Sequence, residues 1–263
     1  MNASDLYKAG KLAEAIDAQI KEVKANPADQ ARRLFLFELL VFSGDIERAR
    51  KQIDAIKYEQ IDLEHALNSY RQLLLAEDAR RRLFGSLEAP KFFGAPPEHL
   101  RLRLDAVQRL RDGQGAEAAK LLAEAAQACP PVKGKLNDKP FTELRDCDDL
   151  FASVLEVMAN GSYYWVALEQ IESVTMNPPR FPRDLIWIPA HLELTDESAG
   201  NVFLPALYPR SDEHADPQVK LGRMTDWKEI ENGPVLGAGL HQFLAGEDAI
   251  GVLEWRKLEL EPG

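Results

Sequence analysis

The chain has 263 residues, of which 45% are apolar and 29% charged, a composition typical of a folded globular protein. Its formal net charge of −11 argues against binding duplex nucleic acid or an anionic membrane through bulk charge. The charge is uneven, because residues 1–134 carry 21 basic and 20 acidic side chains whereas residues 135–263 carry 11 and 23. This asymmetry predicts two domains, which we place at residues 1–132 and 133–263.

The first residues and the cysteines bear on the cellular compartment. MNASDLYKAGKLAEAID lacks the basic start and apolar core of a signal peptide, and no run of about 18 uncharged apolar residues predicts a membrane helix. Cys129 and Cys147 are too few for a disulfide framework and lack the CxxC-like spacing of a thiolate metal site. We therefore expect a cytoplasmic protein in a reducing environment, without a membrane segment.

The N-terminal half has a helical repeat pattern. Residues 4–57 carry apolar side chains at three- and four-residue spacing, and Gly10, Gly44 and Gly113 are each followed five residues later by an alanine. Gly10 and Gly44 lie 34 residues apart, which resembles the tetratricopeptide repeat: glycine permits the turn and alanine lets the paired helices approach. We predict two to three such hairpins with an irregular middle at 62–98. The alternative is an ordinary helical bundle in which these residues coincide by chance.

The second repeat suggests a surface for a partner. Aligning Gly44 with the turn of the repeat places five residues on its concave face: Ala31, Leu34, Glu38, Val41 and Phe42. Large apolar side chains are costly to leave in water, since burying each contributes about 1.5–3 kcal/mol. One hypothesis is a groove that binds an amphipathic helix of a partner protein. The other is that these residues pack against the chain's own helix over residues 62–85, and the sequence leaves both open.

The C-terminal half changes in character after a linker at 133–139. Residues 141–159 predict one last amphipathic helix, ending at Asn160–Gly161. Short β-rich runs bounded by turn residues follow, over 163–166, 171–176, 185–194, 202–208 and 250–260. They predict a small, mostly antiparallel curled sheet or barrel. The expected fold class is α+β, with tetratricopeptide-like helical hairpins followed by a β-rich domain.

Residues with catalytic or metal-binding chemistry are scattered along the sequence. No histidine lies four residues from another, and the acidic run 146–149 falls within the predicted helix, where solvated charge is the usual explanation. The segment GPVLGAG at 233–239 lacks the third glycine of a dinucleotide fingerprint and predicts a turn between strands. We expect no catalytic residue, no metal and no cofactor.

Two further sets of residues invite a functional interpretation. The arginines at 80–82 and 101–111 alternate with acidic side chains on helices, which favours solvated faces over a nucleic-acid interface. Trp165, Trp187 and Trp227 lie in strand-like surroundings and predict core positions, with contact to a partner as the alternative.

Eight blocks of the sequence match the pattern of one family: LYKAGKLAEAI (6–16), NP (26–27), RLFLFELLVFSGD (33–45), YYWVALEQIESV (163–174), PRDLIWIPAHLEL (182–194), LPALYPRS (204–211), LGRMTDW (221–227) and EWRKLEL (254–260). On these blocks the chain resembles the ImpE/TagJ family of type VI secretion accessory proteins along nearly its whole length. Ala167 departs from the pattern, where a proline is expected.

The resemblance implies a cytoplasmic, non-enzymatic protein with a tetratricopeptide-like N-terminal part. It implies binding to the small subunit of the contractile sheath through that subunit's N-terminal amphipathic helix, with an effect on sheath assembly or on its recycling by a ClpV-type ATPase. A second hypothesis is a generic scaffold or chaperone for another cytoplasmic protein. A third is an enzyme whose site lies in the β-rich half, although no recognisable set of titratable groups supports it.

Overall fold

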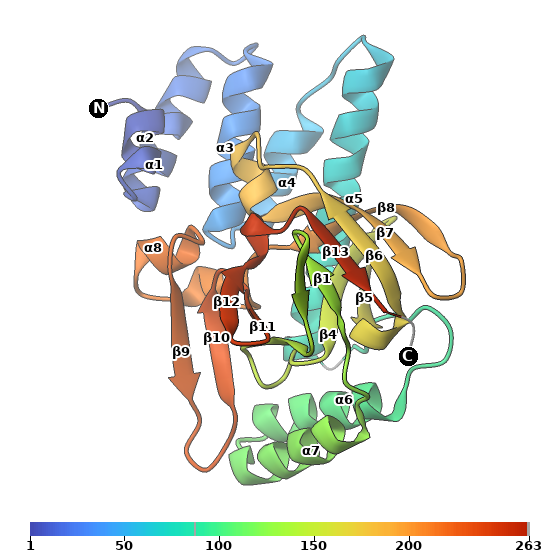
Figure 1. The fold of residues 1–263 in the computed structure, drawn as a ribbon. Coiled ribbons are helices and arrows are strands. Elements are labelled where there is room, and N and C mark those ends of the chain that lie inside the picture. The colour runs from blue at the N-terminus through green and yellow to red at the C-terminus, as the bar shows by residue number, and fades with distance from the viewer. Residues whose placement is uncertain (87, 262–263) are drawn as a thin grey trace.

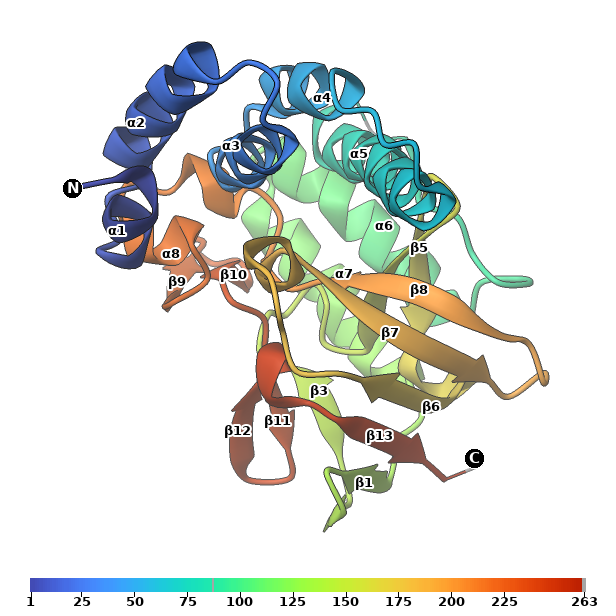
Figure 2. The ribbon, with the colours of Figure 1, turned by 90° about the horizontal axis from the view of Figure 1, so that it is seen from above.

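The N-terminal part of the chain is a series of helical hairpins. The computed structural model describes residues 1–86 and 88–261. Its first helices are α1 (Ala3–Lys8), α2 (Leu12–Ala25), α3 (Gln30–Phe42), α4 (Ile46–Asp54) and α5 (Ile61–Gly85), which we call the helical arm. They lie side by side along an arc (Figure 2). Asp29 and Asp45 begin α3 and α4, because each carboxylate accepts a hydrogen bond from a backbone N–H of the first turn.

A further hairpin lies apart from the arm, at the opposite end of the molecule (Figure 1), and consists of α6 (Glu98–Arg111) and α7 (Gly115–Ala128). The predicted turn glycines all have positive φ: +79° at Gly10, +74° at Gly44 and +73° at Gly113. The alanines five residues later are completely buried. The expected helical hairpins are therefore confirmed. No helix in the described ranges is long and apolar enough to cross a bilayer.

The C-terminal half consists mainly of short antiparallel strands, together with α8 (Pro217–Lys220) and the 3₁₀ turns η1 (Leu168–Gln170), η2 (Pro182–Leu185), η3 (Ser211–Glu213) and η4 (Val252–Glu254). The strands are β1 (Gly134–Leu136), β2 (Lys139–Phe141), β3 (Leu144–Asp146), β4 (Val154–Ala159), β5 (Ser162–Ala167), β6 (Ile171–Met176), β7 (Trp187–Leu194), β8 (Ala199–Pro205), β9 (Thr225–Glu229), β10 (Val235–Gly239), β11 (Gln242–Ala245), β12 (Asp248–Gly251) and β13 (Lys257–Leu260).

These strands form three sheets. The largest has eight strands in the order β2-β1-β13-β6-β7-β8-β4-β5, so that β13 lies between β1 and β6. The hairpin β10-β9 and the sheet β12-β11-β3 are smaller. The α+β fold class is therefore confirmed.

Three sequence predictions in this half are wrong. The expected linker at 133–139 contains β1 and the start of β2. Residues 141–159 do not form a helix; they contain the end of β2, β3 and β4. The segment 233–239 is mostly strand β10, not a turn. In β4 the residues from Val154 to Met158 are all buried, and such an uninterrupted apolar run has no period of two to distinguish a strand from a helix.

The two halves share a hydrophobic core. One cluster joins Phe37 and Leu74 of the arm to Trp165 and Trp187 of the sheets, and a second cluster lies within the β-rich half. Helix α5 packs against β4 and β5, which positions the arm on the sheet (Figure 2). The N-terminal series of helices ends at Ala128, and the first strand begins at Gly134. The first core cluster contains residues from both sides of the proposed boundary at 132–133. The division into two domains therefore stays a prediction.

Candidate functional site

The five residues predicted to line a groove all lie on α3, and the structure covers three of them. Ala31 is exposed and Leu34 is half-buried. Both belong to the first half of α3, a helix that begins at the end of the arm pointing away from the sheets (Figure 1). Glu38, Val41 and Phe42 are each 5% exposed or less. Residues of α5 and of the C-terminal half surround Val41 and Phe42. The chain itself therefore occupies much of the concave face.

Arg183 of η2 makes the main polar contact with this face. Its Nη1 donates a hydrogen bond to Oε1 of Glu38 at 2.6 Å, and its Nε donates to the hydroxyl of Tyr70 on α5. The guanidinium also lies over the Phe181 ring, 4.0 Å from its centroid. Burial raises the pKa of Glu38, which Arg183 partly offsets. Arg183 thus neutralises a carboxylate that would otherwise be buried without a partner.

Residues further along the chain cover the ends of the first two hairpins. Arg223 donates hydrogen bonds from its guanidinium to the backbone carbonyls of Tyr7 at 2.7 Å and Lys8 at 3.0 Å. Asp212 approaches Gly44 so closely that a Cβ there would lie 1.9 Å from its carboxylate. Parts of residues 182–223, which we call the covering segment, therefore contact the arm at α1, α3 and α5.

A buried ionic network fixes α5 to the sheets. Arg80 of α5 donates two hydrogen bonds to the carboxylate of Glu156 on β4, at 2.7 and 2.6 Å, and a third to the carbonyl of Leu207. His241, in the turn between β10 and β11, lies 3.0 Å from Glu156 through Nε2 and 2.7 Å from Asp146 through Nδ1. Each of these four residues is at most 5% exposed.

The pKa values in this network follow from burial and pairing. Burial lowers the pKa of His241, but Asp146 and Glu156 outweigh it and raise that pKa to about 9. Burial raises the pKa of Glu156, but Arg80 and His241 outweigh it and lower that pKa to about 2. An imidazolium between two carboxylates results, with both ring nitrogens engaged.

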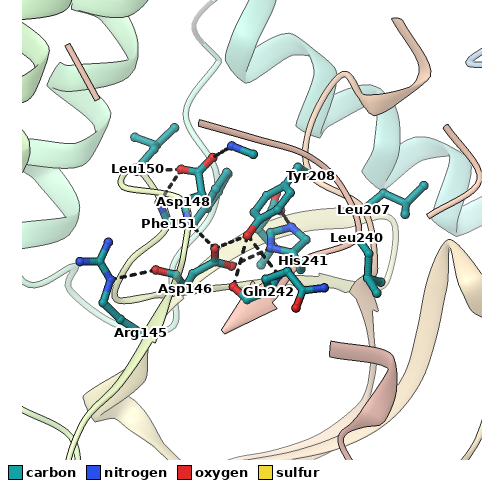
Figure 3. Close-up of polar contacts among 12 residues, drawn as sticks. Arg145, Asp146, Asp148, Leu150, Phe151, Leu207, Tyr208, Leu240, His241 and Gln242 are labelled. Carbon is teal, nitrogen blue, oxygen red and sulfur yellow. Dashed lines mark hydrogen bonds and ion pairs between the residues drawn. The ribbon is translucent and has the colours of Figure 1, made fainter. Parts of the chain in front are cut away.

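Asp146 also organises the loop that follows β3 (Figure 3). Its Oδ1 accepts hydrogen bonds from the hydroxyl of Tyr208 and from the backbone N–H of Asp148 at 2.8 Å. Asp148 in turn accepts hydrogen bonds from the N–H groups of Leu150 and Gly237 at 2.8 and 2.7 Å. Burial and the neighbouring Asp146 raise the pKa of Asp148 to about 7. These contacts use the carboxylates for structure and leave His241 no room to act as a base on a substrate.

A pocket of about 390 Å³ lies beside α6 and α7, close to this network. Apolar side chains of α5, α6 and β10 line it, and Asp148 also belongs to the lining. Three cations belong to the same lining: Arg111, Arg210 and Lys228. The arrangement suits an apolar group with an acidic neighbour.

The predicted core positions of the three tryptophans are right for two and wrong for Trp227. Trp165 and Trp187 are completely buried or nearly so, which confirms their core positions, whereas Trp227 on β9 is 39% exposed. Beside Trp227 the exposed Met224 and the thiol-bearing Cys147 line a shallow pocket. Trp227 is thus the member of the set that is free to contact another molecule.

Sequence reasoning missed the buried network. It assigned Asp146 to a solvated helix, and it considered the histidines singly. His241 reaches its two carboxylates across 95 and 85 residues of sequence, so no motif of fixed spacing reveals the group. The one signal is a histidine between β-forming runs, which predicts burial but names no partner.

Comparisons with known proteins point to one family, and two of them span nearly the whole chain. Residues 138–259 match the family described as "ImpE protein". Over 262 residues the chain is 33% identical to the type VI secretion system accessory component TagJ of Pseudomonas aeruginosa, covering 100% of this chain and 92% of that protein. A crystal structure of protein VPA1032 from Vibrio parahaemolyticus has a TM-score of 0.89 at 24% identity, covering 98% of this chain and 97% of that one. This last likeness shows the fold.

Proposed function

The chain belongs to the ImpE family, and from this membership we propose that it is a non-enzymatic cytoplasmic adaptor of a type VI secretion system. The observation that carries the proposal is the 33% identity, over the full chain, to a protein named as an accessory component of that system. The proposed partner is the small subunit of the contractile sheath, bound through its N-terminal amphipathic helix. The proposed effect is on sheath assembly or recycling.

The site chemistry supports an adaptor over an enzyme. His241, Glu156 and Asp146 form a buried cluster of titratable groups, and each is engaged with another side chain. A general base needs a lone pair within reach of a substrate proton, and a buried imidazolium between two carboxylates has none to offer. The network holds the arm in place instead.

We propose that the partner helix binds the free end of the arm. Ala31 and Leu34 remain accessible on α3, and Ile61 and Leu63 at the start of α5 are 71% and 41% exposed. Both helices begin at the same end of the arm (Figure 1). In this proposal Glu38, Val41 and Phe42 support the surface from beneath. The arm and α6–α7 region, residues 1–134, is near neutral, so binding relies on apolar contact more than on charge.

A pull-down with purified sheath small subunit tests this proposal. The full chain should retain the intact subunit and lose most of a form without its N-terminal helix. Equal recovery of the two forms would overturn the helix-mediated mechanism.

A matched pair of substitutions locates the surface. Ala31→Arg adds a large charged side chain at the free end of the arm, and Ala126→Arg makes the same change at an exposed position of α7. We expect Ala31→Arg to weaken capture more than tenfold and Ala126→Arg to leave it unchanged. The reverse result would move the binding surface to the other hairpin.

The alternative function is a scaffold or chaperone for another cytoplasmic protein. The pocket beside α6 and α7 favours it, because its apolar lining and three cations suit an acidic segment with an apolar side chain. Charge reversal at Lys228 distinguishes the two: Lys228→Glu should leave capture of the sheath subunit intact and abolish capture of a partner that uses the pocket.

A further inference from the structure

Three side chains with metal-binding chemistry converge where the α6–α7 hairpin meets the sheet. His99 lies in the first turn of α6, Cys129 is the residue that ends α7, and Glu169 belongs to η1 between β5 and β6. One donor atom of each, a ring nitrogen, the sulfur and a carboxylate oxygen, lies within 4.8 Å of the other two. The group is distinct from the His241 network and has no part in the proposed partner surface.

The histidine is already oriented as a ligand would be. Its Nδ1 lies 3.1 Å from the hydroxyl of Ser153, and its Nε2 lies 2.6 Å from Oε1 of Glu169. Metal-bound histidines characteristically use one ring nitrogen for the metal and give the other to a hydrogen-bond partner that fixes the tautomer. Ser153 fills that second role here.

The hydrogen bond between His99 and Glu169 does not satisfy all the donor atoms of this group. Oε2 of Glu169 is buried and has no hydrogen-bond partner in the part of the chain that the structure describes. A buried carboxylate oxygen without a partner is unfavourable by about 1–3 kcal/mol. The sulfur of Cys129 lies beside this pair, where its contacts are weak: a 3.5 Å contact to the Pro130 carbonyl and the hydroxyl of Ser153. Two donor atoms are therefore left without a strong partner at one place.

We propose that His99, Cys129 and Glu169 bind a Zn²⁺ ion, with water completing a tetrahedral shell. Nitrogen, thiolate sulfur and carboxylate oxygen are the donors that zinc takes in proteins. Bonds of about 2.0–2.3 Å place tetrahedral donors roughly 3.3–3.7 Å apart. The Glu169 carboxylate, whose side chain is 19% exposed, rotates away from His99 to reach this spacing.

Binding changes the protonation of two ligands. The Cys129 thiol loses its proton to solvent, and the histidine keeps its remaining proton on Nδ1, where it donates to Ser153. Burial raises the pKa of Cys129 and Glu169 adds to this, while Ser153 and the nearby Arg103 lower it. The ion supplies the charge that makes the thiolate stable at this place, and zinc affinity should therefore rise with pH.

The site joins three segments that are far apart in sequence. A bound ion ties both ends of the α6–α7 hairpin to the strand pair β5–β6 through η1. This is a structural role, in which the ion stabilises the folded state by mass action. At a free zinc concentration of 100 times Kd, we expect the thermal midpoint to rise by about 5–10 °C.

The test uses the full, untagged chain, freed of metal with a chelator and titrated with zinc against a chromogenic competitor. The wild type should bind one equivalent. Cys129→Ser and His99→Gln should each lower zinc affinity more than tenfold, and Ser153→Ala should lower it about tenfold with the stoichiometry kept. Cys147→Ser is the matched control, because it removes the other cysteine and should change nothing.

Replacing zinc with cobalt shows directly whether the Cys129 thiolate binds the metal. Co²⁺ bound to a thiolate gives a charge-transfer band in the near ultraviolet, which the wild type and Cys147→Ser should show and Cys129→Ser should lack. Circular dichroism of the metal-free variants separates loss of binding from loss of folding. Absence of stoichiometric binding by the folded wild type, or binding that survives both Cys129→Ser and His99→Gln, would overturn the proposal.

Discussion

The hairpins α3–α4 and α6–α7 are built alike and used differently. Each turns at a glycine with nearly the same backbone, φ +74° at Gly44 and +73° at Gly113, and each has a completely buried alanine five residues later. Yet a Cβ on Gly44 would collide with Asp212, whereas a Cβ on Gly113 would meet nothing within 4 Å. The first hairpin is covered by the covering segment, and the second leaves a pocket open beside it.

The difference shows that a repeat motif determines local geometry but not exposure. On α3 the covering segment supplies a cation for Glu38, an aromatic contact for Phe37 and an acidic group beside the turn. On α6 the main polar contacts are those of Arg103, which donates to the carbonyls of Asp149 and Leu150 at 2.7 and 2.8 Å. Which hairpin offers a surface is decided by residues more than a hundred positions away.

The largest effect should come from breaking the network that holds the arm to the sheet. Glu156→Ala leaves Arg80 and His241 as buried cations without their shared carboxylate, and we expect it to lower the free energy of unfolding by about 3–5 kcal/mol. Urea denaturation followed by circular dichroism measures the loss. Arg210→Ala at the exposed pair with Glu213 is the control, with about 0–1 kcal/mol expected. Equal losses would mean that the network does not anchor the arm.

The same network should make stability depend on pH. The pKa of His241 is raised from 6.5 to about 9, so the folded state holds a proton that the unfolded state releases between these values. The contribution of His241 to stability is therefore full below pH 6.5 and falls as pH rises to 9, by on the order of 2–3 kcal/mol. Asp148, with its pKa raised to about 7, acts in the same direction at lower pH. Denaturation midpoints at a series of pH values test this.

Three neighbours of His241 determine the shape of this pH profile. Asp146 and Glu156 favour its proton, whereas Arg80 opposes it. The variant His241→Gln is less stable at neutral pH but should show little further loss between pH 6.5 and 9. A variant profile parallel to that of the wild type would assign the pH dependence to other groups.

A smaller effect is expected where η2 meets α3. Arg183→Ala leaves Glu38 buried without its cation. We expect it to lower the free energy of unfolding by about 2 kcal/mol. Combining it with Glu38→Gln removes the unpaired carboxylate charge and should recover part of the lost stability. Strictly additive losses in this double-mutant cycle would show that the pair does not couple the covering segment to the arm.

The smallest effect is expected from substitutions at the two turn glycines. Gly113→Ala introduces a Cβ at positive φ in open space and should lower the free energy of unfolding by about 1 kcal/mol. Gly44→Ala carries the same backbone strain and also displaces Asp212 from Arg81, so its loss should be about 1 kcal/mol larger. Thermal or urea denaturation of the two variants measures the difference. Identical losses would contradict the close cover of the first hairpin.

Local signals predicted much of the fold. The glycine and alanine spacing marked the hairpins, since only glycine takes that turn backbone at little cost. The β-forming runs from Tyr163 to Tyr208 marked β5 to β8, because alternation and turn residues bound them. The errors fell where a strand is buried on both faces, as β4 is, and where Asp146 and Asp148 are held by partners outside their own segment.

The candidate sites were less predictable for a related reason. The burial of Val41 and Phe42 depends on the covering segment, and no pattern within α3 predicts this burial. His99, Cys129 and Glu169 meet only because α6, α7 and η1 do. The expectation that a thiolate metal site needs CxxC-like spacing holds for ligands on one loop, not for ligands from three segments.

The distance in sequence between α3 and its cover has a consequence for synthesis. Glu38 and Arg183 are separated by 145 residues. At the usual speed of a ribosome this interval corresponds to roughly 7 to 30 s. During that time the nascent arm presents the apolar side of α3 to water, next to whatever other chains are nearby. We expect chains that terminate before the covering segment to aggregate or to be degraded, and chains that extend beyond it to escape both.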